Sequence, residues 1–379
     1  MTLHRARPPE TGPEYRLRIV RPVLGELTPD LRAAAFRHGA TAVAWGDRPS
    51  IAGDRRVLDG LAADPALPED FRSALLRLSS AWKRLRFSLP LRDGRRIEMG
   101  DPPAIMGVIN ATPDSFSDGG RHIDPGLALA AALQMEEDGA AIIDIGGEST
   151  RPGSEGVSAE EEWRRVEPVL RRIRGAAGVP ISIDTTKADV ARRALDAGAD
   201  VINDVSALLD DPAMAKVAVE TGAPVILMHR RGRPRDMQID PRYDNVSREV
   251  YEFLDERIRT LEREGIDPAR IVVDPGIGFG KKVVHNLSLL RDIDELRGLG
   301  KPVLVGASRK SFMGRLLSPP KDENSSWGAE HWREVSTLAA HGAAAQSGAA
   351  ILRVHEVRSH RDYLRILWAI AGPDRTPAE

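Results

Sequence analysis

Charged and amide side chains stand at the ends of eight short apolar runs in the sequence. Taken singly, each has an ordinary explanation, because an Asp such as Asp184 can cap a helix and a lysine such as Lys310 can be a surface residue. Capping does not explain why all eight ends are polar, and buried polar groups are costly without a partner. The set therefore predicts a ligand site. Its members are Asn110, Asp144, Asp184, Asn203, Asp204, His229, Asp274, Ser308, Arg309, Lys310, Arg353 and His355.

Four of these residues suit a flat ring that is rich in nitrogen. Asp184 and Asp274 supply carboxylate acceptors. Asn203 can both donate and accept a hydrogen bond, and Lys310 adds a cation. An amino-pyrimidinone edge carries a ring N–H and an exocyclic amine, which need such acceptors. The pattern therefore predicts a heterocycle of this kind as the ligand.

Further residues indicate a phosphate group on the same ligand. Arg353, His355 and Arg151 would neutralise an anionic phosphate. Asn110 is an oxygen donor of the type that suits Mg2+, which commonly holds phosphates with few protein ligands. The glycine-rich segment 276–281 permits either close approach of the backbone or movement.

The eight runs and the stretches between them predict a barrel. The runs are apolar with little polar alternation, which is typical of parallel strands buried on both faces. Amphipathic stretches such as 126–139, 158–175 and 245–265 suit helices that cover a sheet. A chain of 379 residues accommodates a (β/α)8 TIM barrel, of class α/β, and a further module. An open doubly wound sheet is the alternative, although eight repeats favour the barrel. The runs are 104–109, 141–145, 181–183, 201–203, 224–228, 270–274, 302–306 and 350–354.

Residues 1–98 differ from the rest and predict a small α/β N-terminal module of unknown role, before a barrel over residues 99–379. The segment SLPLRDGRRIEMG (88–100) has an Asp-Gly turn between alternating segments and predicts a hairpin. In a barrel, this hairpin would plug the amino-terminal end. Earlier strands are expected at 16–23 and 41–45, and helices at 27–39 and 71–85.

The composition excludes several classes of protein. A net charge of −2 argues against a nucleic-acid-binding surface, which needs an excess of basic residues. The absence of cysteine excludes disulfides, thiolate zinc sites and a cysteine nucleophile. The N-terminal segment lacks the apolar stretch of a signal peptide, and no window approaches a membrane span. We therefore expect a cytoplasmic protein.

Eight segments, in order along the chain, resemble the signature segments of the dihydropteroate synthase family. The first two are IMGVINATPDSFSDGG (105–120) and DIGGESTRPGSEGV (144–157). The resemblance covers about residues 104–372. It implies a transferase of folate biosynthesis that condenses 6-hydroxymethyl-7,8-dihydropterin diphosphate with 4-aminobenzoate, by an SN1-like displacement of diphosphate. The other six segments are SIDTTK, VINDVSAL, LMHRRGRPRDMQ, DPGIGFGK, GASRKSFMG and LRVHEV.

The resemblance also implies roles for individual residues, with catalysis depending on Lys310, Arg353 and His355. The loops 111–121 and 149–157 would close over the substrates. Sulfonamides would compete with aminobenzoate, and the protein would be a homodimer. The pterin would be held by Asp184, Asn203, Met228, Asp274 and Lys310; the diphosphate by Thr150, Arg353 and His355; the aminobenzoate by Arg151, Pro152, Phe279 and Ser308; and Mg2+ by Asn110, with Asp114 or Asp118 as a further ligand.

The sequence departs from the family pattern at a few positions. Arg230 and Arg231 follow His229 where Met and then Gln or Arg are common, and Glu356 replaces a common Asp. Three alternatives stay open: a pterin-binding methyltransferase domain of the same fold, a catalytically silent relative, and a bifunctional folate enzyme with a second activity in residues 1–98. The SRK segment and the LRVH ending favour the synthase.

Overall fold

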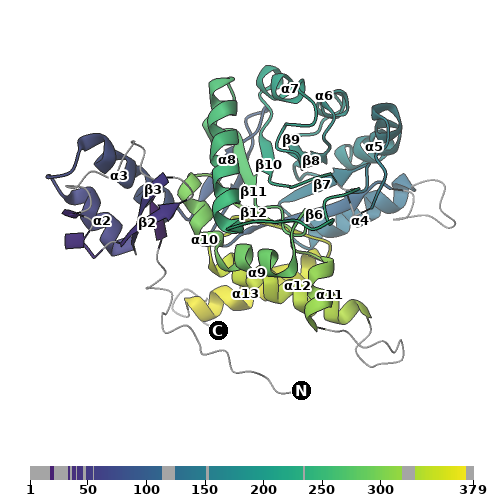
Figure 1. Cartoon of the computed structure of the whole chain (residues 1–379). Coiled ribbons are helices and arrows are strands. Elements are labelled where there is room, and N and C mark those ends of the chain that lie inside the picture. Colours follow the sequence, from purple (N-terminus) through teal and green to yellow (C-terminus); the bar gives the residue numbers. More distant parts are fainter. Residues whose placement is uncertain are drawn as a thin grey trace. The chain divides into compact units, whose positions relative to one another are not determined.

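A computed structural model of the chain, drawn in Figure 1, describes residues 55–112, 124–150, 153–233, 235–317 and 329–372, with short stretches at 18–20, 33–34, 36–39, 41–45 and 48–53. The chain divides into two compact units, Met1–Arg84 and Leu85–Glu379. Each unit has a hydrophobic core of its own. The residues for which the sequence predicts chemistry all belong to the second unit.

The second unit is a barrel of parallel strands, as the sequence predicts. Within the described residues, eight strands lie side by side in the order β11-β10-β9-β8-β7-β6-β13-β12. A bridge between Val273 and Val303 brings the two edges together, so the barrel is nearly closed and the open sheet is excluded. The strands are β6 (Ala104–Asn110), β7 (Ile142–Gly146), β8 (Ile181–Asp184), β9 (Val201–Asp204), β10 (Val225–Met228), β11 (Ile271–Asp274), β12 (Leu304–Val305) and β13 (Ile351–Val354).

Helices connect the strands and cover the outside of the barrel (Figure 1). The side chains of Asp124, Ser158 and Asn245 each accept a hydrogen bond from a first-turn amide, which fixes where three of the helices begin. No helix in the described part of the chain is long and apolar enough to cross a membrane. The helices are α4 (Pro125–Glu137), α5 (Ala159–Arg174), α6 (Ala188–Asp196), α7 (Met214–Thr221), α8 (Val246–Arg263), α9 (Val283–Arg291), α10 (Ile293–Leu296), α11 (Ser311–Leu317), α12 (Ala329–Gln346) and α13 (Val357–Ala371), with 3-10 turns η2 (Pro268–Arg270) and η3 (Arg297–Leu299).

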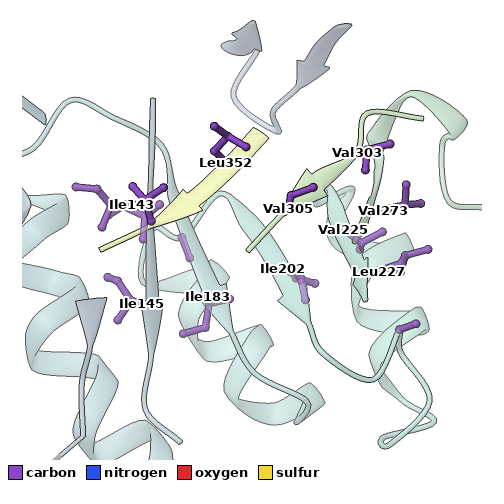
Figure 2. Packing of buried hydrophobic residues seen from close by; sticks show 14 of the residues in the cluster. Ile143, Ile145, Ile183, Ile202, Val225, Leu227, Val273, Val303, Val305 and Leu352 are labelled. Atoms are coloured by element: carbon purple, nitrogen blue, oxygen red, sulfur yellow. The ribbon is translucent and has the colours of Figure 1, made fainter. Parts of the chain in front are cut away.

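Side chains along each barrel strand alternate between two layers. Outward-facing residues such as Ile143 and Leu227 pack against the helices, and Figure 2 shows part of this layer. Their chain neighbours Ile142 and Ile226 belong to a second cluster inside the barrel. Since the period of a strand is two, Asp144 continues the inward row that begins with Ile142. Position along the strand therefore decides which polar residues enter the barrel.

A hairpin closes the amino-terminal end of the barrel. Strands β4 (Phe87–Pro90) and β5 (Arg96–Met99) pair in antiparallel register. The apolar side chains of Leu89 and Ile97 belong to the same inner cluster as the inward-facing residues of the barrel strands. Burial of these side chains fills the end of the barrel, and the plug predicted from the sequence is confirmed.

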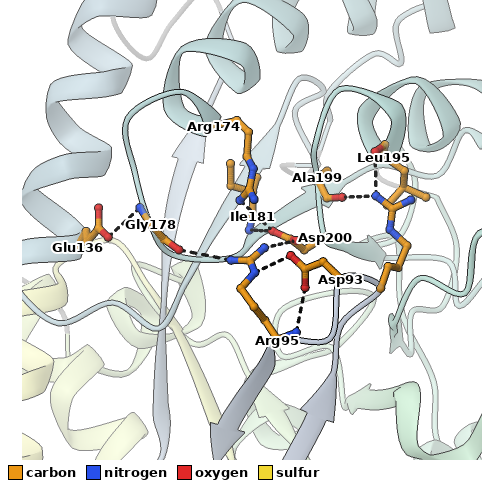
Figure 3. Close-up of polar contacts among 10 residues, drawn as sticks. Asp93, Arg95, Glu136, Arg174, Gly178, Ile181, Leu195, Ala199 and Asp200 are labelled. Carbon is orange, nitrogen blue, oxygen red and sulfur yellow. Dashed lines mark hydrogen bonds and ion pairs between the residues drawn. The ribbon is translucent and has the colours of Figure 1, made fainter.

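Two arginines in the turn of this hairpin fasten it to the barrel. Arg95 donates to the Asp200 carboxylate at 2.6 Å, as Figure 3 shows. Arg92 donates to the backbone carbonyls of Leu195 and Ala199 at 2.8 and 3.0 Å. The hairpin is thus part of the second compact unit, whereas the sequence analysis, which drew its boundary at residue 98, placed it in the N-terminal module.

The first unit has a small α/β arrangement of its own. Helices α2 (Arg55–Ala63) and α3 (Glu69–Lys83) bury Leu58, Leu61 and Phe71 between them. The strands predicted at 16–23 and 41–45 are present at 18–20 and 41–45. The helix predicted at 71–85 is present at 69–83. The third strand was missed because its sequence, RPSIAG, has no apolar run, and helix 27–39 lies mostly outside the described residues. The elements are β1 (Arg18–Val20), β2 (Thr41–Trp45), β3 (Arg48–Gly53), α2 (Arg55–Ala63) and α3 (Glu69–Lys83), with sheet order β1-β3-β2.

Candidate active site

Among the described residues, inward-facing side chains from seven strands stand at the carboxyl end of the barrel, its mouth. Side chains two positions apart on a strand point to the same side. Each of these side chains either follows an inward-facing apolar residue by two positions or pairs with an inward-facing position of the neighbouring strand, and is called in phase for that reason. Asp204 is out of phase with this row, and its carboxylate accepts hydrogen bonds from Ser206 instead. The residues in phase are Asn110, Asp144, Asp184, Asn203, Met228, Asp274 and Arg353.

A hydrogen-bond network joins three of the predicted residues through Asp144, which the sequence analysis left without a role. Arg353 donates from Nε to Oδ2 of Asp144 at 2.7 Å, and from Nη2 to Oδ2 of Asp184 at 2.8 Å. Asn203 donates to the same oxygen of Asp144 at 3.1 Å. The Asp144 side chain has no exposed surface, so these donors compensate a fully buried charge. Asp144 therefore sets the orientation of Asn203 and Arg353.

Two carboxyl groups of the mouth hold their protons more tightly than usual. Burial raises the pKa of Asp184 to about 7, even though the Arg353 guanidinium acts in the opposite direction. Burial also raises the pKa of Asp274 to about 6, although the Gly276 amide donates to its Oδ1 at 2.6 Å. A ligand with several N–H groups would favour the ionised carboxylates by donating to them. The mouth therefore suits a ring of the kind predicted.

Lys310 lies over the ring of Phe279, with Nζ 4.1 Å from the ring centroid. Burial lowers the pKa of Lys310 to about 8, and Arg353 lowers it further, while Asp274 raises it. These mutual effects place Lys310 within electrostatic reach of Asp274 and Arg353. The structure thus brings Lys310 to the same mouth as the carboxylates. Phe279 also belongs to an apolar cluster with Val205, Met228 and Met237.

The glycine-rich segment 276–281 packs directly against the backbone that follows β10. Gly276 has a positive φ, and a Cβ there would collide with the carbonyl oxygen of His229. The buried Lys281 donates to His229 Nδ1 at 3.0 Å and to the Phe279 carbonyl at 3.0 Å. Burial lowers the pKa of His229 well below its usual value, which keeps the ring neutral as an acceptor. The glycines allow segment 276–281 to pack closely against the neighbouring backbone. His229 stabilises this segment by accepting from Lys281.

Ser308 and His355, from the ends of β12 and β13, are hydrogen-bonded to each other. The distance from Ser308 Oγ to His355 Nδ1 is 2.8 Å. Thr150 and Asp184 both line a cavity of about 470 Å3. Asn110 is the last residue of β6. The predicted residues Arg151, Pro152, Asp114 and Asp118 lie outside the described residues.

The residues that depart from the family pattern take part in ion pairs. Arg230 pairs with Asp210, and both line the cavity. Arg231 donates to Glu249 at 2.8 Å. Glu356 accepts from Arg309 at 2.7 Å. Each departure is therefore accommodated by a local charge partner.

Comparison with known proteins follows the same part of the chain. The family model described as "Pterin binding enzyme" matches residues 106–355. A dihydropteroate synthase of Synechocystis is 42% identical over 285 residues, covering 75% of this chain and 96% of the relative. A solved Xanthomonas albilineans dihydropteroate synthase with 4-aminobenzoic acid is 43% identical, with TM-score 0.68, covering 76% of this chain and 100% of that chain. Another from this organism, in complex with 7,8-dihydropteroate, is 41% identical, with TM-score 0.63, covering 73% of this chain and 95% of that chain.

Proposed function

The chain belongs to the dihydropteroate synthase family of pterin-binding transferases, and from that premise we propose how the mouth of its barrel joins a pterin diphosphate to 4-aminobenzoate. The observation that carries the proposal is the network in which Asp144 and Asp184 hold Arg353 beside Asn203. It presents carboxylate, amide and guanidinium groups together at the end of a plugged barrel.

The pterin ring lies in this mouth with its amino-pyrimidinone edge against carboxylates. Asp184 and Asp274 accept from the ring nitrogens and the exocyclic amine, and Asn203 completes the edge. Lys310 donates to an acceptor on the ring. Met228 supplies an apolar surface at the mouth, where it belongs to the cluster around Phe279.

The reaction breaks the carbon–oxygen bond to diphosphate and forms a carbon–nitrogen bond to the arylamine, which then loses a proton. The barrier is dominated by separation of charge between the leaving diphosphate and a pterin-stabilised cation. Arg353 and His355, with Thr150, stabilise the departing oxygens. An arylamine is already a neutral nucleophile at pH 7, so the step uses no covalent enzyme intermediate. The loops 111–121 and 149–157 close over the substrates and exclude water.

The aminobenzoate pocket lies beside the pterin, with Arg151, Pro152, Phe279 and Ser308 around it. The position of Phe279 under Lys310 supports this assignment, because the pocket then adjoins the end of the ring that reacts. The hydrogen bond between Ser308 Oγ and His355 Nδ1 fixes Ser308. Sulfonamides of similar shape would occupy the same pocket.

Mg2+ fits the donor chemistry at the end of β6. Among the described residues, no group of three or more His, Cys, Asp or Glu side chains is placed to hold a metal. Asn110 offers a neutral oxygen at the mouth, which suits an ion held mainly by phosphate and water, with Asp114 or Asp118 as a further ligand. When bound, the ion would neutralise charge on the diphosphate.

Chelation of Mg2+ should therefore suppress the condensation. With excess EDTA, we expect the rate of diphosphate release to fall by an order of magnitude or more, because charge on the leaving group is then less neutralised. Binding of a pterin without diphosphate should be unchanged and serves as the control. A rate that is indifferent to EDTA would remove the metal from the proposal.

Binding of the pterin ring should depend on pH in a bell-shaped manner. Asp184 and Asp274, with pKa values of about 7 and about 6, are strong acceptors when ionised. Protonation makes each a weaker acceptor and turns one oxygen into a donor, so affinity should fall as the pH drops through this range. Lys310, with a pKa of about 8, loses its charge above that pH, so affinity should fall again. Calorimetric titration of the chain with 6-hydroxymethylpterin across this range measures the profile. An affinity that is constant over the range would contradict the assigned contacts.

The activity itself is tested by incubating the purified chain with the pterin diphosphate, Mg2+ and 4-aminobenzoate. We expect dihydropteroate and diphosphate in equal amounts, and inhibition by a sulfonamide that is relieved by added aminobenzoate. Pterin binding without diphosphate release would instead indicate a silent relative. Transfer of a methyl group from a methylated folate to a corrinoid would indicate the methyltransferase alternative.

The chain has two parts with separate roles: residues 1–84 belong to an extension of unknown role, and residues 85–379 carry the chemistry. Deletion of residues 1–84, up to the edge of the first compact unit, should leave kcat and KM within about twofold, because this cut keeps the hairpin with the barrel. The assay above measures this, with circular dichroism to verify folding. A folded but inactive barrel would contradict the division.

The protein acts as a homodimer in the cytoplasm. Ile366 and Ile370 of α13 are exposed by 64% and 73%, which gives a second copy apolar surface to cover. The alanine-rich helix α12 serves packing within the barrel unit, since a Cβ on Gly342 would collide with the Tyr363 hydroxyl. The absence of cysteine fits a reducing compartment.

A further inference from the structure

Two buried histidines form a hydrogen-bonded pair outside the mouth of the barrel. His341 lies on α12 and His360 on α13, and neither has any exposed surface. The distance from His341 Nδ1 to His360 Nε2 is 2.9 Å. Neither residue belongs to a segment that resembles the family signatures. The pair therefore needs an explanation of its own.

The backbone groups at either end of the pair determine where its protons lie. The Ala307 amide donates to His341 Nε2 at 2.9 Å, so this nitrogen carries no proton. The proton of His341 is then on Nδ1, which donates to His360 Nε2. His360 must in turn carry its proton on Nδ1, which donates to the Glu356 carbonyl oxygen at 2.7 Å. The two rings form one continuous chain of hydrogen bonds with a single direction.

This chain of hydrogen bonds joins the two segments that carry the proposed catalytic residues. Ala307 directly precedes Ser308, and Glu356 directly follows His355. The segment at Ala307 is a tight turn, closed by a bond from the Lys310 amide to the Ala307 carbonyl at 3.3 Å. Anything that fixes the Ala307 amide therefore fixes the turn that presents Lys310.

The turn needs such support because its backbone is strained. Arg309 has a φ of 57°, in the left-handed region that a residue with a Cβ adopts at a cost. Its amide donates to Thr337 Oγ1 at 3.2 Å, and its side chain donates to Glu356 at 2.7 Å. Thr337 lies one turn before His341 on the same helix. The helix thus supports the turn at two successive points.

We propose that His341 and His360 are positioning residues, which hold the Ala307–Lys310 turn in register with the end of β13 and thereby place Lys310 and His355 for the reaction. The proposal rests on the function proposed above, because it concerns the placement of those two residues. Neither histidine touches a substrate. They act through the backbone at Ala307 and Glu356.

The surroundings of the pair keep both rings neutral. Burial lowers the pKa of His341 well below its usual value, and the neighbouring His360 and His355 act in the same direction. Burial also lowers the pKa of His360. Glu334 has Oε1 3.7 Å from His360 Nδ1, and burial raises the pKa of this carboxyl, which weakens it as a counter-charge. A proton added to His341 Nε2 would face the Ala307 N–H, so a charged ring is incompatible with the arrangement.

The proton positions can be tested on the full chain without any assay of activity. In the chain labelled with 15N-histidine, we expect His341 and His360 to show a protonated Nδ1 and an unprotonated Nε2, unchanged across neutral pH. The exposed His331, on the same helix α12, lies outside this chain of hydrogen bonds and provides the reference resonance. A proton on Nε2 of either ring, or titration of either ring near neutral pH, would overturn the proposed chain of hydrogen bonds.

The positioning role is tested by His341→Leu, which removes both polar atoms, and His341→Gln, whose amide can accept from Ala307 and donate to His360. We expect His341→Leu to lower kcat by about tenfold or more per folded site, because small displacements of reacting groups are costly. His341→Gln should recover to within about threefold of the wild type, and His331→Leu should have no effect. Sites are counted by the stoichiometry of pterin-ring binding, since a merely structural role would lower the number of sites and leave kcat per site unchanged.

The outcomes separate this proposal from the proposed function. If the wild-type chain makes no dihydropteroate, the proposed function fails. The amide resonances of Ala307 to Lys310 then decide the positioning role, because they should shift in His341→Leu and stay in place in His331→Leu. A folded His341→Leu with kcat within twofold of the wild type, or with these resonances unmoved, overturns the proposal. If His341→Leu does not fold, the same comparison is made with His360→Gln against His360→Leu.

Discussion

Replacing Lys310 by alanine should lower kcat/KM for the pterin diphosphate by about two to three orders of magnitude, which is the effect of losing one preorganised charged donor at a reacting centre. Lys310 is within electrostatic reach of Asp274 and lies over Phe279. The alanine would remove the cation and also leave the Phe279 ring without its cover. Steady-state kinetics with the condensation assay measures the loss.

A second substitution separates the charge of Lys310 from its packing. Lys310→Met keeps an unbranched chain over Phe279 but cannot donate. We expect it to lose nearly as much activity as the alanine variant, and the fall in pterin affinity above about pH 8 should disappear, since that limb is assigned to Lys310. Near-normal turnover in the methionine variant would show that the ammonium group has no part in the reaction.

Replacing Asp144 by alanine should be the most destabilising single change at the mouth. It leaves the Arg353 guanidinium without one of its two carboxylate partners and the Asn203 amide without its acceptor. Breaking a buried ion pair from one side costs about 3–5 kcal/mol of unfolding free energy. Binding of the pterin ring should be lost as well, because both residues would be free to reorient. Chemical denaturation and calorimetric titration measure the two effects.

The chain contains a matched control for this change. Asp204 is also a fully buried carboxylate, on strand β9, which is separated from the strand of Asp144 by β8. It faces out of the inward row and accepts from Ser206. Asp204→Asn should affect stability and leave pterin affinity within about twofold of the wild type. By contrast, Asp144→Asn should weaken pterin binding. The amide oxygen can still accept from Asn203 and Arg353, but the negative charge that holds the Arg353 guanidinium is lost. Equal pterin affinity in the two asparagine variants would contradict the role assigned to Asp144.

The barrel could be predicted from the sequence because its elements are specified locally. The strand 104–109 and the helix 158–175 are visible as an apolar run and an amphipathic stretch with Ser158 at its start, and the structure has both within a residue or so. The hairpin was visible from its Asp-Gly turn. The prediction was least accurate for strand β12, which has two residues, Leu304 and Val305, although a strand of five residues was expected at 302–306.

The arrangement of the site could be predicted only in part. Position at a strand end indicated Asp184 and Arg353, but the bond between them joins residues 169 positions apart, which no local pattern reveals. The role of Asp144 could have been found from the two-residue period, because it stands in phase with the apolar Ile142. The link between His341 and His360 joins two helices and carries no signal in the sequence.

The hairpin of residues 87–99 has a consequence for how this molecule can change. It forms a sealed floor at one end of the barrel, fastened by Arg92 and Arg95, while the reacting groups stand on the opposite rim. Substitutions in the hairpin are expected to alter thermal stability, and substitutions at the mouth are expected to alter the reaction. Stability can therefore be adjusted at the hairpin without altering the chemistry, whereas at the mouth the two are coupled, as they are at Asp144.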